Sequence, residues 1–179
     1  MSNTTVYLQS RYRSRMHESR VGSDRLESLR EALVVTGERE RSDVIAPFRG
    51  DPFTSIPAGT EADVEAAVER AEAAQAPWAD RPVTERAAVL ERYADRVIEA
   101  QDELLDVAQL ETGKTRRDAF EEVLDVVQTA TYYADAGPEL LESQRRRGAI
   151  PGLTKTTVHR RPKGVAGFIS PWNYPVTLS

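Results

Sequence analysis

The sequence has 179 residues, with 40% apolar and 30% charged side chains, which is typical of a folded globular chain with a hydrophobic core. The net charge of −5 argues against general nucleic-acid binding, because a nucleic acid attracts basic surfaces. No apolar run approaches the roughly 20 residues that span a bilayer. The absence of cysteine excludes disulfides and a cysteine nucleophile, and two distant histidines predict no metal site.

Residues 1–42 are predicted to form a flexible, Arg-rich extension. Leu26, Leu29 and Leu33 recur at helical spacing before Gly37, which predicts one short helix within it. The first 25 residues lack the apolar segment of a secretory signal, so we expect a cytoplasmic protein that does not bind membranes.

Residues 43–57 have the composition of a β-hairpin. Two short β-type runs, 44–46 and 53–56, flank the turn-forming segment 47–52, and Pro57 is expected to end the second strand.

Three helical segments follow the predicted hairpin. The first begins at Thr60, which with Asp63 resembles a capping box, and carries an apolar stripe over 64–74. We expect Pro77 to end this helix and Trp78 to be buried.

The second helix is predicted over 84–109 with Gly113 as its stop, and the third over about 116–135. Both carry apolar residues at helical spacing. The positions expected to face the core are Leu90, Tyr93, Ala94, Val97, Ile98, Leu104, Leu105 and Ala108, followed by Phe120, Val123, Leu124, Val127, Ala130 and Ala134.

After Gly148 the pattern becomes β. Residues 154–160 read as a polar strand with two solvated faces, whereas the apolar run 164–169 is typical of a strand buried on both faces of a parallel α/β sheet. The sequence offers only one such strand, so we expect the α/β domain to be incomplete.

Two motifs have ordinary structural explanations. Gly113-Lys114-Thr115 invites comparison with a phosphate-binding loop, but Ala108 stands where the first glycine of that loop is required, which favours a helix end with a cation at its negative pole. The basic run 145–147 is interpreted as a solvated segment before a strand, with an anion or acidic partner as the alternative.

The segment 170–175, Ser-Pro-Trp-Asn-Tyr-Pro, is the strongest candidate site. Two prolines stiffen a loop at the carboxyl end of the predicted buried strand, where α/β folds bind ligands. Trp172 offers a broad apolar surface, and Asn173 offers a neutral amide donor of the kind used in oxyanion holes. Simple packing of Trp172 and a turn at Asn173 are open alternatives.

Residues 161–175 closely resemble the aldehyde dehydrogenase superfamily at its first cofactor-domain strand, and 110–114 resemble a second hallmark of that family. The resemblance covers about 43–179. It implies an α/β fold in which helices and a hairpin precede the first strands of a truncated cofactor-binding domain. Residues 145–154 resemble the succinate-semialdehyde dehydrogenase branch.

The resemblance implies NAD- or NADP-dependent oxidation of a small aldehyde, with succinate semialdehyde as the expected substrate. It assigns Asn173 as the oxyanion donor and places four residues along the cofactor cleft, namely Ile169, Ser170, Pro171 and Trp172. The family's nucleophilic cysteine and base glutamate have no counterpart here, so the chain alone is expected to be inactive.

Residues 154–160 resemble the first oligomerisation-arm strand of the family, which implies a homo-oligomer. Two other classes stay open on the sequence alone. One is a non-catalytic helical binding module, and the other is half of a split enzyme completed by a C-terminal partner chain.

Overall fold

The computed structural model describes residues 21–22, 24–25, 28–29, 33, 35 and 37–179. The chain separates into two units, Met1–Leu33 and Val34–Ser179. The short helix predicted before Gly37 falls largely outside the described residues. All helices and strands considered below belong to the second unit. In the part of the chain that is described, no helix combines the length and apolar character needed to cross a membrane.

The predicted hairpin is confirmed. Strands β1 (Arg41–Ala46) and β2 (Asp51–Pro57) pair antiparallel, with a register irregularity between Val44 and Ile45. Gly50 closes the turn with a φ of +77°, a left-handed conformation that glycine adopts without steric cost. Its N–H donates to the Ala46 carbonyl at 2.9 Å.

Helix α3 spans Glu61–Ala79 and begins at the predicted capping pair. The Asp63 carboxylate accepts hydrogen bonds from the Thr60 backbone N–H and hydroxyl, both at 2.8 Å, and forms an ion pair with Arg39. The carboxylate therefore satisfies a backbone donor at the positive end of the helix dipole.

The prediction that Pro77 ends this helix is wrong, because α3 continues to Ala79. A proline in the last turn removes only one backbone hydrogen bond, and the Asp80 N–H still donates to the Ala76 carbonyl at 3.1 Å. Trp78 is 42% exposed, contrary to the prediction of burial, and Val64 and Val68 are also exposed. The described part of the chain does not cover this face of α3.

The single helix predicted over 84–109 is two helices, α4 (Val83–Glu99) and α5 (Gln101–Thr112). Ala100 lies between them with a ψ of 6°, far from the helical value near −42°. Its N–H and carbonyl still bond to Arg96 and Leu104, both at 3.0 Å. The backbone bonding and the apolar period therefore run through the break, which leaves no signal in the sequence.

Helix α6 spans Arg116–Leu141, six residues beyond the predicted end. It begins at Thr115, whose hydroxyl oxygen accepts a hydrogen bond from the Asp118 N–H at 3.2 Å. Pro138 lies inside the helix close to its end, where a missing N–H costs little.

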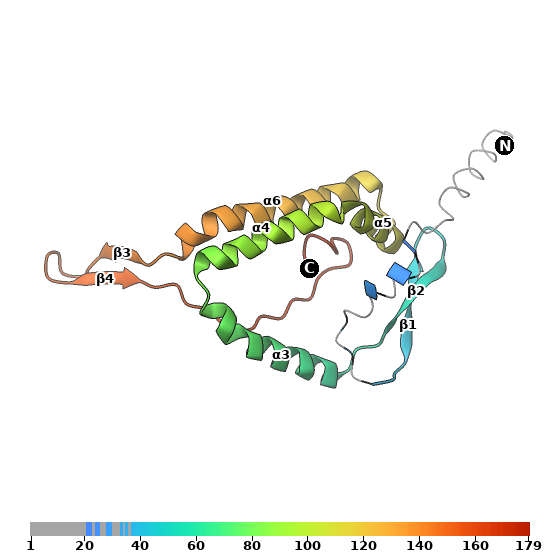
Figure 1. Ribbon diagram of the computed structural model, residues 1–179, viewed down its shortest axis with the longest axis horizontal. Helices are drawn as coiled ribbons and strands as arrows, with labels where there is room; N and C mark the ends of the chain where they lie inside the picture. Colours follow the sequence, from blue (N-terminus) through green and yellow to red (C-terminus); the bar gives the residue numbers. More distant parts are fainter. Residues whose placement is uncertain (1–20, 23, 26–27, 30–32, 34, 36) are drawn as a thin grey trace. The chain divides into compact units, whose positions relative to one another are not determined.

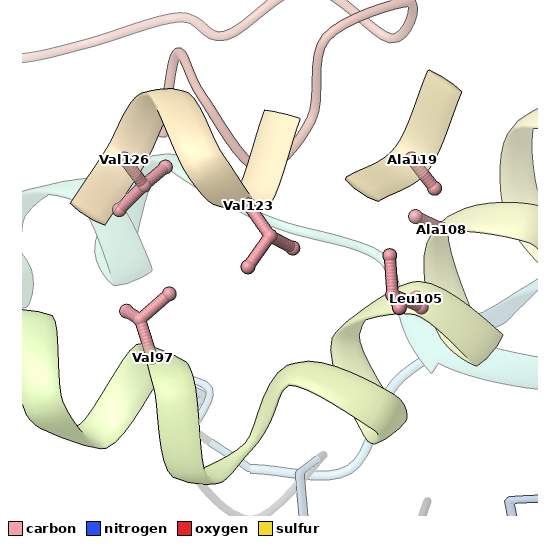
Figure 2. Close-up of a cluster of buried hydrophobic side chains, with 6 residues drawn as sticks. All are labelled: Val97, Leu105, Ala108, Ala119, Val123 and Val126. Carbon is pink, nitrogen blue, oxygen red and sulfur yellow. The ribbon is translucent and has the colours of Figure 1, made fainter. Parts of the chain in front are cut away.

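The core of the second unit lies between α4, α5 and α6 (Figure 2). Helices α4 and α6 lie side by side (Figure 1). Of the predicted core positions, several are buried and four are exposed. The buried ones include Ala94, Val97, Val123, Ala130 and Ala134, and the exposed ones are Tyr93, Ile98, Phe120 and Leu124. The apolar stripe on each helix is wider than the seam that one neighbouring helix covers.

The last regular element is a second hairpin, made of β3 (Gln144–Arg147) and β4 (Lys155–Val158). Strand β4 confirms the strand predicted over 154–160. Strand β3 contains the basic run 145–147, so the interpretation of this run as a segment preceding a strand is wrong, because the run is itself part of a strand. Its arginines are exposed, as that interpretation expects. Such a run lacks the alternation of apolar and polar residues that indicates a half-buried strand, so the sequence pattern does not predict this one.

Candidate functional site

The candidate site begins with an extended segment, residues 161–171, that contains no helix or strand. The prediction of a buried strand over 164–169 is wrong for this structure: Phe168 is 82% exposed and Ile169 is fully exposed. A strand needs neighbours for its backbone N–H and C=O groups. The described residues form two separate sheets, the hairpins β1–β2 and β3–β4, and neither hairpin pairs with this segment.

The chain then folds back in a series of turns over 172–178. The Leu178 N–H donates to the Tyr174 carbonyl at 3.2 Å, and the Ser170 hydroxyl donates to the Leu178 carbonyl. Trp172 is 80% exposed. The Asn173 side chain is also exposed, and its amide makes no hydrogen bond to any residue that the structure describes.

Lys114 brings the loop between α5 and α6 to this turn. Gly113 ends α5 in the left-handed conformation, with a φ of +74°, and Lys114 follows it directly. The Lys114 Nζ donates to the Asn173 carbonyl at 2.8 Å and lies 4.9 Å from the centroid of the Tyr174 ring. A cation at this distance over an aromatic face is attracted by the ring quadrupole.

Glu122 holds the same turn from within α6. Only 1% of this residue is exposed, and its carboxylate forms an ion pair with Lys114. The second carboxylate oxygen accepts hydrogen bonds from the backbone N–H groups of Val176 at 3.0 Å and Thr177 at 3.4 Å. The Thr177 hydroxyl donates to the Glu122 carbonyl at 3.3 Å. Except for the ion pair with Lys114, each of these contacts joins residues that are separated by more than 50 positions in the sequence.

Arg116 fixes the other side of the α5–α6 loop. Its guanidinium bonds to Asp102 at 2.6 Å and also pairs with Asp106, so it ties the start of α6 to α5. The hydrogen bond to Asp106 raises the pKa of Arg116 above its ordinary value, although burial acts in the opposite direction. The loop that carries Lys114 therefore lies between Gly113, which ends α5, and Arg116, whose charged guanidinium binds two aspartates of α5.

The structure thus brings two separately identified motifs together, because Lys114 of the 110–114 motif contacts Asn173 of the 170–175 loop. Ile169, Ser170 and Pro171 precede that contact and are exposed. Sequence reasoning missed Glu122. The available signal was a carboxylate set among the apolar residues of α6, between Ala119 and Val123, which are both buried.

The family profile described as "Aldehyde dehydrogenase family" matches residues 34–179. The chain belongs to the aldehyde dehydrogenase family. This match confirms the resemblance found in the 110–114 and 161–175 motifs, and it extends upstream of residue 43.

Relatives with assigned names support the same family. The chain is 49% identical over 156 residues to a Mycobacterium tuberculosis protein provisionally named succinate-semialdehyde dehydrogenase [NADP(+)] 2, covering 87% of this chain and 30% of that protein. It is 37% identical over 132 residues to a succinate-semialdehyde dehydrogenase [NADP(+)] from Deinococcus radiodurans, covering 74% and 27%. The chain therefore spans about 30% of the length of the first of these relatives.

Solved structures agree with the fold. A NAD-dependent benzaldehyde dehydrogenase from Corynebacterium glutamicum matches with a TM-score of 0.72 and 34% identity, over 81% of this chain and 32% of that one. Aldehyde dehydrogenase 21 from Physcomitrella patens, in complex with the reaction product succinate, matches with a TM-score of 0.72 and 27% identity, over 80% and 30%. The predicted fold class is confirmed as part of the aldehyde dehydrogenase fold.

Proposed function

We propose that these 179 residues form the N-terminal part of an NAD(P)-dependent aldehyde dehydrogenase that oxidises succinate semialdehyde to succinate. Family membership supports the reaction class. The names of the Mycobacterium tuberculosis and Deinococcus radiodurans relatives support the substrate and favour NADP as the cofactor.

Within that enzyme, Asn173 supplies an oxyanion donor. Attack of a nucleophile on an aldehyde places negative charge on the former carbonyl oxygen, and a fixed N–H donor stabilises that charge. The observation that carries the proposal is the exposed Asn173 amide, which is free of hydrogen bonds to the described residues and is attached to an anchored backbone. An asparagine that merely formed a turn would use its amide within the turn.

The cofactor cleft is assigned to the residues just before Asn173. Ile169 and Trp172 present exposed apolar faces, and Pro171 stiffens the backbone between them. Such surfaces fit the flat rings of a nicotinamide cofactor, with the Ser170 backbone available for polar contacts. The cofactor, when bound, accepts the hydride that leaves the substrate.

The β3–β4 hairpin is proposed as an oligomerisation arm. Its residues are mostly exposed, and among the described residues each strand pairs only with the other. Unpaired strand edges are ready sites for backbone pairing with a second chain. A homo-oligomer or a completing C-terminal chain would use this surface.

The decisive test uses an extended chain, defined as residues 1–179 joined to the part of the Mycobacterium tuberculosis relative that follows the matched segment. Asn173→Ala should lower kcat with succinate semialdehyde by on the order of 10²–10³-fold, the usual cost of losing one oxyanion donor. Cofactor binding should change little, because the amide acts on charge that develops after attack.

Asn173→Asp is the matched variant, since it keeps the size of the side chain but replaces the donor with a carboxylate that repels the oxyanion. It should be no more active than Asn173→Ala. Melting temperature measured on the same preparations separates a catalytic role from a structural one. Near-normal turnover per folded molecule in Asn173→Ala would reject the assignment.

A further inference from the structure

The position of Glu122 in α6 is unusual for a charged residue. It lies between the core residues Ala119 and Val123 and is 1% exposed. Burying a carboxylate costs several kcal/mol unless its oxygens are paired and hydrogen-bonded. Here one oxygen pairs with Lys114, and the other accepts two backbone N–H groups. These partners, rather than the packing of α6, account for a carboxylate at this position.

Apart from Lys114, the partners of Glu122 all belong to one short stretch of chain. Its carboxylate fixes the backbone of Val176 and Thr177, and its own carbonyl accepts the Thr177 hydroxyl. The Val176 side chain packs against the helical core. The end of the turn is thus attached to α6 by polar and apolar contacts together.

Lys114 fixes the start of the same turn. Its Nζ donates to the Asn173 carbonyl and lies over the Tyr174 ring, while its charge is balanced by Glu122. The Lys114 side chain is only 14% exposed. The backbone of Asn173 is therefore restrained at its own carbonyl and again three residues later.

We propose that Lys114 and Glu122 are positioning residues that hold the backbone of Asn173 so that its amide faces the substrate oxygen. The proposal rests on the oxyanion role assigned to Asn173 above. Displacement of an oxyanion donor by about 1 Å is enough to lose most of its effect. Loss of either positioning residue should therefore lower the chemical step while the Asn173 side chain is still present.

The first experiment measures amide hydrogen exchange by NMR on the 179-residue chain. Glu122→Gln and Lys114→Met should each lower protection of the Val176 and Thr177 amides at least tenfold, with the amides of α4 unchanged. Glu121→Gln is the matched control, because Glu121 lies next to Glu122 but is 63% exposed and pairs only loosely with Arg117 at 3.6 Å. Unchanged protection at Val176 and Thr177 in both test variants would overturn the proposal.

A single variant leaves a buried charge without its partner and so risks unfolding the chain. The double variant Lys114→Met/Glu122→Gln removes both charges together. It should fold, as judged by normal exchange in α4, and should still lose protection at Val176 and Thr177. Retention of that protection in the folded double variant would count against the proposal.

The second experiment is a double-mutant cycle on the extended chain. Glu122→Gln alone should lower kcat at least tenfold and leave KM within threefold. In an Asn173→Ala background, the same change should lower kcat less than threefold, because the residue through which it acts is already absent. Equal losses in both backgrounds would show that Glu122 acts independently of Asn173 and would overturn the proposal.

The two experiments can reject the role of Asn173 and the role of Glu122 independently of each other. A normal kcat in Asn173→Ala would overturn the oxyanion role of Asn173. Loss of protection at Val176 and Thr177 in Glu122→Gln would in that case still support Glu122 as the residue that fixes this turn.

Discussion

Gly113 ends helix α5 at the point where the chain turns toward Lys114. Two features require glycine there: the φ of +74°, and the Pro47 side chain, whose Cγ would lie 3.0 Å from an added Cβ. Gly113→Ala should therefore lower the free energy of unfolding by about 1–3 kcal/mol, the usual range for strain at a left-handed position. Chemical denaturation of the 179-residue chain, followed by circular dichroism, measures this change.

Gly137→Ala provides the control for Gly113→Ala. Gly137 lies within α6, is not among the glycines with a positive φ, and an added Cβ there would meet no atom within 4 Å beyond its chain neighbours and its own helix backbone. Alanine at an unstrained helical position adds up to about 1 kcal/mol of stability, somewhat less here because Pro138 follows. Equal losses from the two substitutions would mean that neither the left-handed backbone nor the contact with Pro47 limits residue 113.

The residue scale also shows what the sequence cannot predict. Gly113 as a helix stop and Thr60 with Asp63 as a cap are both readable because each depends on local chemistry, whereas the role of the 170–175 loop stays a prediction. Glu122 is not readable in this way. Its role arises from backbone groups of Val176 and Thr177, more than 50 positions away, which no local pattern connects to it.

At the scale of elements, residues 164–170 contrast with the helices. The segment carries strand-forming, apolar residues, yet it is extended and exposed and is hydrogen-bonded into neither hairpin. Its amides should therefore exchange at close to the rate of an unfolded chain in the 179-residue protein. Amides of α4 and α6 should be protected, because both helices border the core.

This contrast is measured by hydrogen exchange with mass spectrometry or NMR on a preparation shown to be monomeric. In the extended chain, where strand neighbours are available, protection of 164–170 should rise by orders of magnitude. Strong protection of these amides in the monomeric 179-residue chain would contradict the prediction and indicate a pairing partner.

The same contrast explains which elements could be predicted. The first hairpin, α3, α6 and β4 were readable because turn residues, caps and periodicity act within the element. The break at Ala100 was not, since one changed ψ angle leaves the apolar period intact. The strand predicted over 164–169 would form only beside neighbouring strands. The sequence indicates that a segment prefers burial, but it does not show whether a partner strand is present.

At the scale of the whole molecule, large apolar residues are exposed on the outer faces of the core helices and also in elements that do not form the core. Val64 and Trp78 of α3, and Phe168 and Trp172 near the candidate site, are all at least 42% exposed. The chain spans about 30% of the length of its Mycobacterium tuberculosis relative. We propose that the rest of such an enzyme covers these surfaces.

The 179-residue chain alone should not oxidise succinate semialdehyde with either NAD or NADP. The family reaction as implied by resemblance begins with attack by a thiolate, and this sequence contains no cysteine. An oxyanion donor acts only on charge that attack creates, so Asn173 by itself has nothing to stabilise.

Cofactor reduction monitored at high chain concentration provides the measurement, with the extended chain as the positive control. The 179-residue chain carrying Asn173→Ala is the matched negative control, because a contaminating dehydrogenase would contribute equally to both preparations. Turnover that scales with the concentration of the 179-residue chain, and that falls in its Asn173→Ala variant, would be contrary to this prediction. It would mean that a residue of this chain other than cysteine starts the reaction, while leaving Asn173 as the donor.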